Sequence, residues 1–515
     1  MKWKSLYHNG IAFPVPYEPK GLTVKINSSV VKLEGLAEEM VYAWAKKKET
    51  PYVLDPVFGK NFLEDLCKQL PKEYKNSRIE DFDFTEVYRL IEEEKDMRTK
   101  PEIKKTLAVE RKRKREELRS LFGVAVMDGR KVEVANWMAE PPGLFLGRGQ
   151  HPLRGRWKPM IVPKDITLNL SKDATKPDGQ WGKIVHDDGS MWLARWIDRL
   201  TKKEKYVWLS DSASIKQTRD KSKYDLANQL EKRIDRVRRK ITKSLHSRDE
   251  KERKIGMVCF LLDALAMRVG DEKDEDEADT VGATTLRFEH IKMKPERIEF
   301  DFLGKDSVRW QKSIELKEVD PVVPRYFAKL LEGKSAGDPV FDGIDSRHVN
   351  RLLGRAMKGL TAKVFRTFIA TNIVRNYIHT NTISKEEASD NLKIYHAKIA
   401  NLRAAVICNH KRSPPKNWEN GILKKEETLE RLEKSTTKTD KQAEKLAARK
   451  EKVKLSIDLA KKTKEYNLGT SLRNYIDPRV FKSWSEKNGM DWTKIYTASL
   501  QKKFRWANRS KVNWS

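Results

Sequence analysis

Five side chains in the second half of the chain have residue types and positions that suit the binding of an anion. They are Arg268, Lys305, Arg366, His410 and Tyr475. Guanidinium and ammonium groups are typical ligands of phosphate and carboxylate oxygens. All five are expected at or near the ends of helices and strands, where a rigid element can hold a side chain in a fixed position.

Three of these residues also have an ordinary structural interpretation. Arg268 follows the apolar helical run 255–267 and precedes Gly270, so it could simply interact with a helix dipole. Lys305 lies at the tip of a predicted strand hairpin, 297–316, where a solvated lysine is common. Arg366 lies on the predicted helix 361–379, opposite its apolar face, and is expected at the surface unless a cleft meets it.

The other two residues follow the same pattern. His410 comes directly after a predicted helix, 386–408, and a helix C-terminus favours a protonated imidazole. A capping histidine is the ordinary alternative. Tyr475 precedes Asp477-Pro478, where Asp477 can cap a helix that begins at Pro478. Taken singly, none of the five residues identifies a site.

The overall charge favours a polyanionic partner. The 515 residues include 106 Lys plus Arg against 75 Asp plus Glu, a net charge of +31. Such an excess releases counterions from a polyphosphate, so a nucleic acid is the expected partner. The longest apolar run, 255–267, is shorter than the ~20 residues of a spanning helix, so no membrane is expected. Three widely spaced cysteines fit a reducing, intracellular compartment.

The sequence lacks the residue spacing that motifs for nucleotide or metal binding require. Gly333-Lys334-Ser335 resembles the end of a phosphate-binding loop, but Ala328 stands where the first glycine is required. The nine histidines and three cysteines show no metal-ligand spacing. We therefore expect neither an ATP site nor a protein-bound metal.

The patterns predict an α+β multidomain chain. The expected domains are 1–210 (with a subdomain of about 18–107 inserted between 1–17 and 108–210), 211–412, 413–465 and 466–515. The first has mixed α/β character, and the second is mostly helical with a small β-sheet. A single amphipathic helix is predicted over 222–245, with a basic outer face. The acidic run 271–279 is expected as a solvated loop.

Two charged segments are predicted to be helical. Residues 98–120 contain Arg111-Lys-Arg-Lys-Arg115, which could be a solvated helix face, a nucleic-acid contact or a nuclear-targeting run. Residues 422–468 lack Gly and Pro and predict an antiparallel helical hairpin with a turn near 435–437. Its 15 basic and 10 acidic residues over 414–465 suggest a semi-independent arm that contacts nucleic acid.

In their order along the chain, the segments around the five residues resemble the eukaryotic-type DNA topoisomerase IB family. The matching segments are Met267-Arg268-Val-Gly-Asp-Glu-Lys, Asp279-Thr-Val-Gly, Phe300-Asp-Phe-Leu-Gly-Lys305-Asp-Ser, Leu360-Thr-Ala-Lys-Val-Phe-Arg366-Thr, Cys408-Asn-His410-Lys-Arg-Ser-Pro-Pro and Leu468-Gly-Thr-Ser-Leu-Arg-Asn-Tyr475-Ile-Asp-Pro-Arg. The resemblance extends upstream through Pro16-Tyr-Glu-Pro19 and Glu140-Pro-Pro-Gly-Leu-Phe145, and so covers nearly the whole chain.

This resemblance implies a role for each residue. Tyr475 would be the nucleophile and Lys305 the general acid, with the phosphate bound by Arg268, Arg366 and His410. The implied DNA contacts are Arg148, Asp306, Lys363 and Asn474. Three of these, Arg148, Asp306 and Asn474, lie at positions where camptothecin-class inhibitors bind in the family. Leu146 replaces an arginine usual in the family, so Arg148 stands alone there.

The resemblance also implies an activity. A type IB topoisomerase is a DNA clamp, with an N-terminal cap and a helical-hairpin linker. It relaxes positive and negative supercoils by single-strand cleavage through a 3′-phosphotyrosyl intermediate, controlled rotation and religation. It needs neither ATP nor an essential divalent metal, and we expect a monomer on double-stranded, preferably supercoiled, DNA.

The expected location follows from the same resemblance. The chain starts close to the family's core, without the long charged extension of nuclear members, which suggests a compact archaeal-like form or a chain whose extension was trimmed. The archaeal-like form is the favoured expectation, bound to chromosomal DNA in the nucleoid or cytoplasm. A eukaryotic member would be nuclear.

Two other functions remain open from the sequence. A tyrosine site-specific recombinase uses the same reaction, but that family typically has His-x-x-Arg where this chain has Lys363-Val-Phe-Arg366. A non-catalytic basic DNA-binding protein would share the charge. Relaxation of a supercoiled plasmid without ATP distinguishes the three.

Overall fold

The computed structural model of the chain describes residues 2–271, 280–383, 388–415 and 417–510, without the side chain of Asp306. From position 272 onward, the acidic run expected as a solvated loop lies outside the described residues. The chain divides into two compact units, Met1–Lys216 and Gln217–Lys273 with Thr280–Ser515. The finer division into four segments remains a prediction.

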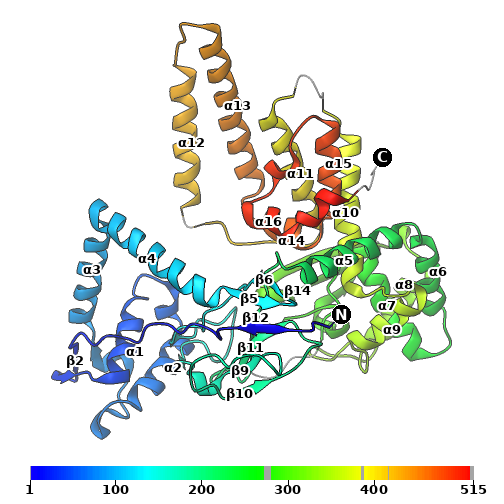
Figure 1. Cartoon of the computed structure of the whole chain (residues 1–515). Helices are drawn as coiled ribbons and strands as arrows, with labels where there is room; N and C mark the ends of the chain where they lie inside the picture. Colours follow the sequence, from blue (N-terminus) through cyan, green and yellow to red (C-terminus); the bar gives the residue numbers. More distant parts are fainter. Residues whose placement is uncertain (1, 272–279, 384–387, 416, 511–515) are drawn as a thin grey trace. The chain divides into compact units, whose positions relative to one another are not determined.

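The first unit combines short β-sheets with helices α1 to α4 (Figure 1). Its sheets have the strand orders β1-β5-β6, β3-β2-β4, β10-β9-β11-β12 and β7-β8. The strands are β1 Leu6–His8, β2 Thr23–Ile26, β3 Ser29–Lys32, β4 Phe82–Asp83, β5 Val124–Met127, β6 Arg130–Glu133, β7 Gly143–Leu144, β8 Trp157–Lys158, β9 Thr167–Asn169, β10 Lys183–Val185, β11 Trp192–Ile197 and β12 Glu204–Trp208. The helices are α1 Gly35–Ala45, α2 Pro56–Cys67, α3 Thr85–Thr99 and α4 Pro101–Phe122.

Helix α4 confirms the predicted charged helix and carries the basic run at 111–115. None of its described residues is buried, so the run lies on a solvated helix. Strand β1 pairs antiparallel with β5, which brings the chain back to its beginning after α1 to α4.

The second unit is mostly helical around one small sheet. Its helices are α5 Ser214–Glu231 (which starts at the boundary), α6 Ile234–Leu245, α7 Glu250–Leu265, α8 Val322–Leu331, α9 Ser346–Ala356, α10 Ala362–Thr380, α11 Asp390–Ile407, α12 Trp418–Glu433, α13 Asp440–Lys462, α14 Leu468–Asn474, α15 Pro478–Lys487 and α16 Ala498–Lys503. The strands β13 Ile291–Met293, β14 Arg297–Gly304 and β15 Val308–Glu315 form an antiparallel sheet in that order. None of the helices within the described ranges is long and apolar enough to cross a membrane.

The prediction of one helix over 222–245 was wrong, because α5 ends at Glu231 and α6 starts at Ile234. The apolar spacing of three and four residues continues across the break, so periodicity could not reveal it. The strand hairpin predicted over 297–316 is confirmed. Gly304 pairs with Val308 across a short 3-10 turn, Lys305–Ser307.

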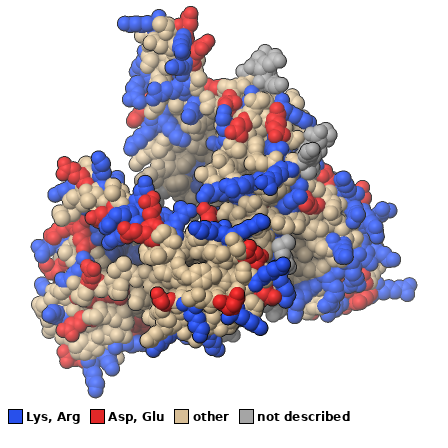
Figure 2. All heavy atoms as spheres, in the orientation of Figure 1, with Lys and Arg blue, Asp and Glu red and all other residues tan. Residues whose placement is uncertain are grey.

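The helical hairpin is also confirmed, since α12 and α13 run side by side and are joined at residues 434–439 (Figure 1). Lysine and arginine side chains gather along it in Figure 2. Helix α13 also packs against α11, and the semi-independence of the hairpin remains a prediction. Tyr395 of α11 hydrogen-bonds Asp458, and Lys462 Nζ donates to the Tyr395 hydroxyl at 3.0 Å. These partners are 63 and 67 residues from Tyr395, so no local pattern could predict the contact.

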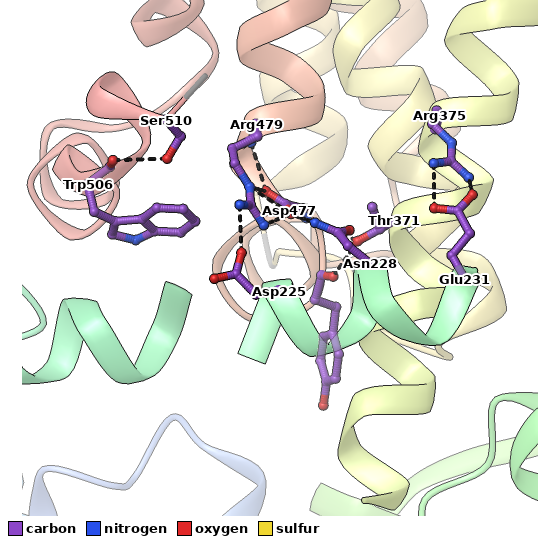
Figure 3. A network of polar contacts seen from close by, with 10 residues as sticks. Asp225, Asn228, Glu231, Thr371, Arg375, Asp477, Arg479, Trp506 and Ser510 are labelled. Carbon is purple, nitrogen blue, oxygen red and sulfur yellow. Dashed lines mark hydrogen bonds and ion pairs between the residues drawn. The ribbon is translucent and has the colours of Figure 1, made fainter. Parts of the chain in front are cut away.

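A buried polar network fixes the start of α15 (Figure 3). The Asp477 carboxylate is fully buried and accepts hydrogen bonds from the backbone N–H of Arg479 at 2.9 Å and from its guanidinium Nη2 at 2.7 Å. Asn228 of α5 donates to the same carboxylate at 3.3 Å, and Arg479 also pairs with Asp225 of α5. The network therefore joins α5 to the segment that follows Tyr475.

Removing the Asp477 carboxylate should destabilise this unit strongly. Because Asp477→Ala leaves the buried Arg479 without its main partner, we expect the free energy of unfolding to fall by ~3–5 kcal/mol. Urea denaturation measures the change. The matched control is Asp225→Ala, whose side chain is 39% exposed and whose loss should cost about 1 kcal/mol or less. Equal losses in the two variants would contradict the assignment of Asp477 as the buried anchor.

Candidate active site

Tyr475 lies between α14 and α15, and its side chain is only 7% exposed. Its N–H donates to Ser471 O at 2.9 Å, which closes the last turn of α14. Asp477 caps α15 as predicted, with Pro478 in the first turn. The nucleophile candidate is therefore held between two helix ends.

A hydroxyl on α10 fixes the backbone on both sides of Ile476. Thr371 Oγ1 donates to Tyr475 O at 3.1 Å and accepts from the Asp477 N–H, also at 3.1 Å. Thr371 is buried, so water does not compete for these bonds. This residue was missed by the sequence analysis, since a threonine within a helix gives no signal of its own.

Arg268 is the residue that touches the Tyr475 hydroxyl. Its Nη1 donates to the phenolic oxygen at 3.1 Å. Burial lowers the pKa of Arg268, and the nearby charge of Arg366 acts in the same direction. The prediction that Arg268 ends a helix was wrong: α7 ends at Leu265, and Ala266 adopts a left-handed conformation with φ +51°.

The backbone of Arg268 is fixed by a close approach to the segment after the acidic run. Ala283 N–H donates to Arg268 O at 2.8 Å. At Gly270, whose φ is +81°, an added Cβ would lie 2.8 Å from the Cα of Gly282. Glycine at 270 is thus required for both the conformation and the contact.

Arg366 is 4% exposed on α10, although a surface position was expected. Its guanidinium carbon lies 4.9 Å from the centroid of the Tyr475 ring, and its Nη2 donates to Cys408 O at 2.7 Å. The Nε and Nη1 atoms are buried and have no hydrogen-bond partner among the described residues. Leaving buried donors unpaired is costly, so these two point to a ligand.

His410 completes the cluster, with its ring centroid 5.2 Å from that of Tyr475. The imidazole is buried, and neither ring nitrogen has a partner among the described residues. Burial, followed by the charges of Arg366 and Arg268, lowers the pKa of His410 to about 3. The expectation of a protonated imidazole at a helix end was therefore wrong for the free protein, because burial and two cations outweigh the dipole of α11.

Lys305 lies at the tip of the β14–β15 hairpin and is exposed. A small pocket is lined by Lys305 together with Arg268, Arg366, Gly304, Trp310 and Asn409, among others. Lys305 thus opens onto the same pocket as the two arginines. An exposed lysine at a hairpin tip suits proton transfer to a bound group.

The remaining predicted residues are more scattered. Lys363 is exposed in the first turn of α10. Asn474 is half-buried beside Tyr475, where its Nδ2 donates to Thr470 O at 3.2 Å and its backbone carbonyl accepts from Lys223 Nζ at 2.9 Å. Arg148 belongs to the first unit, on an exposed loop after β7. The side chain of Asp306 lies outside the described part of the chain.

The geometry suits one kind of reaction. A tyrosine hydroxyl lies beside an arginine donor. A second arginine has two donors, and an imidazole has two nitrogens, without a partner in the part of the chain that the structure describes. Such donors stabilise charge that develops on a phosphoryl oxygen during attack by a hydroxyl. The cluster can therefore bind a phosphodiester next to a nucleophile.

Comparison with known sequences assigns every part of this architecture to one family. Residues 1–209 match the family described as the DNA binding fragment of eukaryotic DNA topoisomerase I. Residues 212–443 match the catalytic core of eukaryotic DNA topoisomerase I, and residues 447–515 match a C-terminal topoisomerase domain.

Individual relatives agree. DNA topoisomerase 1 alpha of Arabidopsis thaliana is 36% identical over 98% of this chain, which spans 58% of that relative. Human DNA topoisomerase 1 is 35% identical over 98% of this chain, which covers 71% of the human protein. These relatives are eukaryotic, so they give no support to the expected archaeal-like form. With this identity over nearly its whole length, the chain belongs to the eukaryotic DNA topoisomerase I family.

Proposed function

We propose that this chain is a type IB DNA topoisomerase that relaxes positively and negatively supercoiled double-stranded DNA. Tyr475 attacks a backbone phosphodiester, forms a 3′-phosphotyrosyl bond and releases a 5′ hydroxyl, which later attacks in reverse to reseal the strand. The observation that carries the proposal is the Tyr475 hydroxyl held by Arg268 beside the unpartnered donors of Arg366 and His410. Family membership supports the same reaction.

Neither ATP nor an essential divalent metal is needed for this chemistry. Cleavage exchanges one phosphodiester for another, so the two states are nearly equal in free energy and the step is reversible. The torsional energy of the DNA supplies the drive. Arg268 and Arg366 stabilise the additional negative charge on the phosphoryl oxygens, which is the part otherwise taken by a metal ion.

In the free protein His410 is neutral, so it can donate one hydrogen bond to DNA when DNA binds. A neutral imidazole carries one N–H, which can bind a phosphoryl oxygen, and the pKa of about 3 keeps His410 in this form across the working pH range. A bound phosphate is negatively charged and offsets the positive charge of Arg268 and Arg366. It therefore favours a hydrogen bond from His410 to a phosphoryl oxygen.

The low pKa of His410 predicts acid sensitivity of the free protein. In the unfolded chain His410 has an ordinary pKa near 6.5 and binds a proton below that pH. In the folded chain its pKa is about 3, so it stays neutral until the pH approaches 3. Stability is therefore fully present above pH 6.5 and falls below it, by at most about 1.4 kcal/mol per pH unit from this residue.

Urea denaturation at pH 7 and pH 5 measures this effect. His410→Gln should lose less stability than wild type between the two values, whereas the exposed control His379→Gln should behave as wild type. Identical pH dependence in wild type and His410→Gln would show that His410 titrates normally in the folded protein.

Lys305 serves as the general acid. The departing 5′ oxygen is a poor leaving group as an alkoxide, so protonation by a lysine on the hairpin tip lowers the barrier, and the neutral amine then accepts the proton during resealing. The exposed position of Lys305 on the shared pocket supports this role.

Replacing Lys305 should slow cleavage selectively. We expect Lys305→Ala to cleave ~10²- to 10⁴-fold more slowly on an ordinary suicide substrate. A substrate with a sulfur leaving group at the 5′ position needs no proton, so it should restore most of the rate. Rates are measured in single-turnover cleavage. An equal defect on both substrates would mean that Lys305 binds phosphate and is not the acid.

The basic surface is proposed to hold the duplex during rotation. Lysine and arginine side chains gather along the α12–α13 hairpin and in further patches of the face seen in Figure 2, with acidic side chains among them. Lys363 at the start of α10 adds a phosphate contact. Arg148, Asp306 and Asn474 remain the proposed contacts for DNA beside the cleavage point and for camptothecin-class inhibitors. The protein would act as a monomer on chromosomal DNA inside the cell.

Removal of the Tyr475 hydroxyl should abolish activity without abolishing binding. Wild type should relax a supercoiled plasmid with EDTA and without ATP, and should attach to the 3′ end of an end-labelled strand. Tyr475→Phe should do neither, while its affinity for DNA stays within about 3-fold because only the hydroxyl is lost. Tyr466→Phe, at a half-buried tyrosine nine residues upstream, is the matched control and should keep full activity. An adduct formed by Tyr475→Phe, or wild-type attachment to a 5′ end, would overturn the proposal.

A further inference from the structure

Lys312 lies at a position in β15 where the alternation of buried and exposed residues predicts an apolar residue. Trp310 and Ile314, two residues away on either side, are buried on the core face of the sheet, and successive residues of a strand alternate between faces. Lys312 pairs across the sheet with Phe300, which is 1% exposed. A lysine is therefore directed into the core of the second unit.

The ammonium group of Lys312 binds the ends of two different helices. Its Nζ donates to Leu265 O at 2.8 Å and to Ile407 O at 2.6 Å. Leu265 is the last residue of α7, and Ile407 is the last residue of α11. The carbonyls at a helix C-terminus lack partners within the helix and carry partial negative charge. One cation thus binds one terminal carbonyl of each helix.

Each of these helix ends leads to a residue of the active site. Arg268 follows Leu265 by three residues, and His410 follows Ile407 by three residues. Both connections turn through a left-handed residue, Ala266 with φ +51° and Asn409 with φ +52°. The position of each helix end therefore sets the position of the side chain beyond it.

Placing a charge here is unfavourable by itself. Burial lowers the pKa of Lys312 to about 8, and the charge of Arg366 acts in the same direction. No described carboxylate forms an ion pair with Lys312. An apolar side chain would suit the site better for stability alone, since even a partly buried cation without a carboxylate partner is costly. A lysine at position 312 is understandable if its hydrogen bonds to the two carbonyls help to position active-site residues.

We propose that Lys312 is a positioning residue that ties the ends of α7 and α11 together, and thereby sets the spacing between Arg268 and His410 around the scissile phosphate. The inference rests on the proposed function of this site and adds a residue that does not itself touch the substrate. Loss of the tie should let the two segments move apart. Displacements of about 1 Å in an active site can cost ~10²-fold in rate.

The test compares DNA binding with cleavage in Lys312→Met, which keeps the length of the side chain but removes its donors. We expect affinity for a DNA duplex within about 3-fold of wild type, and single-turnover cleavage slower by about 10- to 100-fold. Lys292→Met, an exposed lysine on β13 of the same sheet, is the matched control and should cleave at the wild-type rate.

A second arm separates positioning from a general structural effect. Lys312→Met is combined with Arg268→Ala and His410→Ala, and the slow residual cleavage is measured over long times. If Lys312 acts through these two residues, its replacement should change the residual rate by less than about 3-fold in that background. A full 10-fold or larger loss in the same background would overturn the proposal, as would wild-type cleavage by Lys312→Met in an otherwise normal background.

Two further controls keep the result decisive. If Lys312→Met does not fold by circular dichroism, Lys312→Gln, which retains two N–H donors without charge, is judged by the same criteria. Wild type is assayed in parallel. Absence of an adduct in wild type would refute the proposed function, whereas equal adduct formation by wild type and the variant would refute only the role of Lys312.

Discussion

Positive charge held in a buried site without a neutralising carboxylate is the constraint on which the rest of the second unit depends. Arg268 and Arg366 approach the same tyrosine ring, and no described carboxylate forms an ion pair with either of them. Burial of this charge is unfavourable in the free protein. It lowers the pKa of His410, and it leaves Nε and Nη1 of Arg366 without a hydrogen-bond partner among the described residues. A site of this kind is unfavourable when empty and favourable when a phosphodiester enters it, which is the preorganisation expected for catalysis on DNA.

The surrounding fold can be understood as the means of holding that charge in place. The Tyr475 backbone is fixed by Thr371 from α10, and the segment after it by Asp477 and Arg479, which reach α5. The ends of the α12–α13 hairpin are joined by backbone hydrogen bonds, from Arg412 N–H to Glu465 O and from Asn467 N–H to His410 O, each at 2.8 Å. His410 therefore lies at the base of the hairpin.

Local signals in the sequence predicted local structure well. The β14–β15 hairpin, the α12–α13 hairpin and the cap of α15 by Asp477 each follow from residues close together in the chain. The break between α5 and α6 was missed, since an apolar period continues through it. The predicted end of α7 was two residues beyond the observed end at Leu265. Ala266 adopts a left-handed conformation, which is unusual for alanine and so could not be expected from the sequence.

Properties of the site that depend on tertiary packing could not be predicted from the residues. The burial of Arg366 and the neutral state of His410 arise because α10, α11 and the segment of Tyr475 pack together. Lys312 and Thr371 carry no local motif, and their partners lie up to 106 residues away. The five candidate residues themselves were identified through the ordered family motifs, since each one alone had an ordinary structural interpretation.

The most direct test of the account is to identify the residue that carries DNA in the covalent complex. A suicide substrate with a radiolabelled nucleotide traps the adduct, and nuclease and protease digestion followed by mass spectrometry locates the remaining nucleotide. We expect one modified peptide, with the nucleotide on Tyr475. A nucleotide on any other residue, or a labelled complex that dissociates on denaturation, would contradict the claim that the cationic cluster around Tyr475 is the catalytic centre.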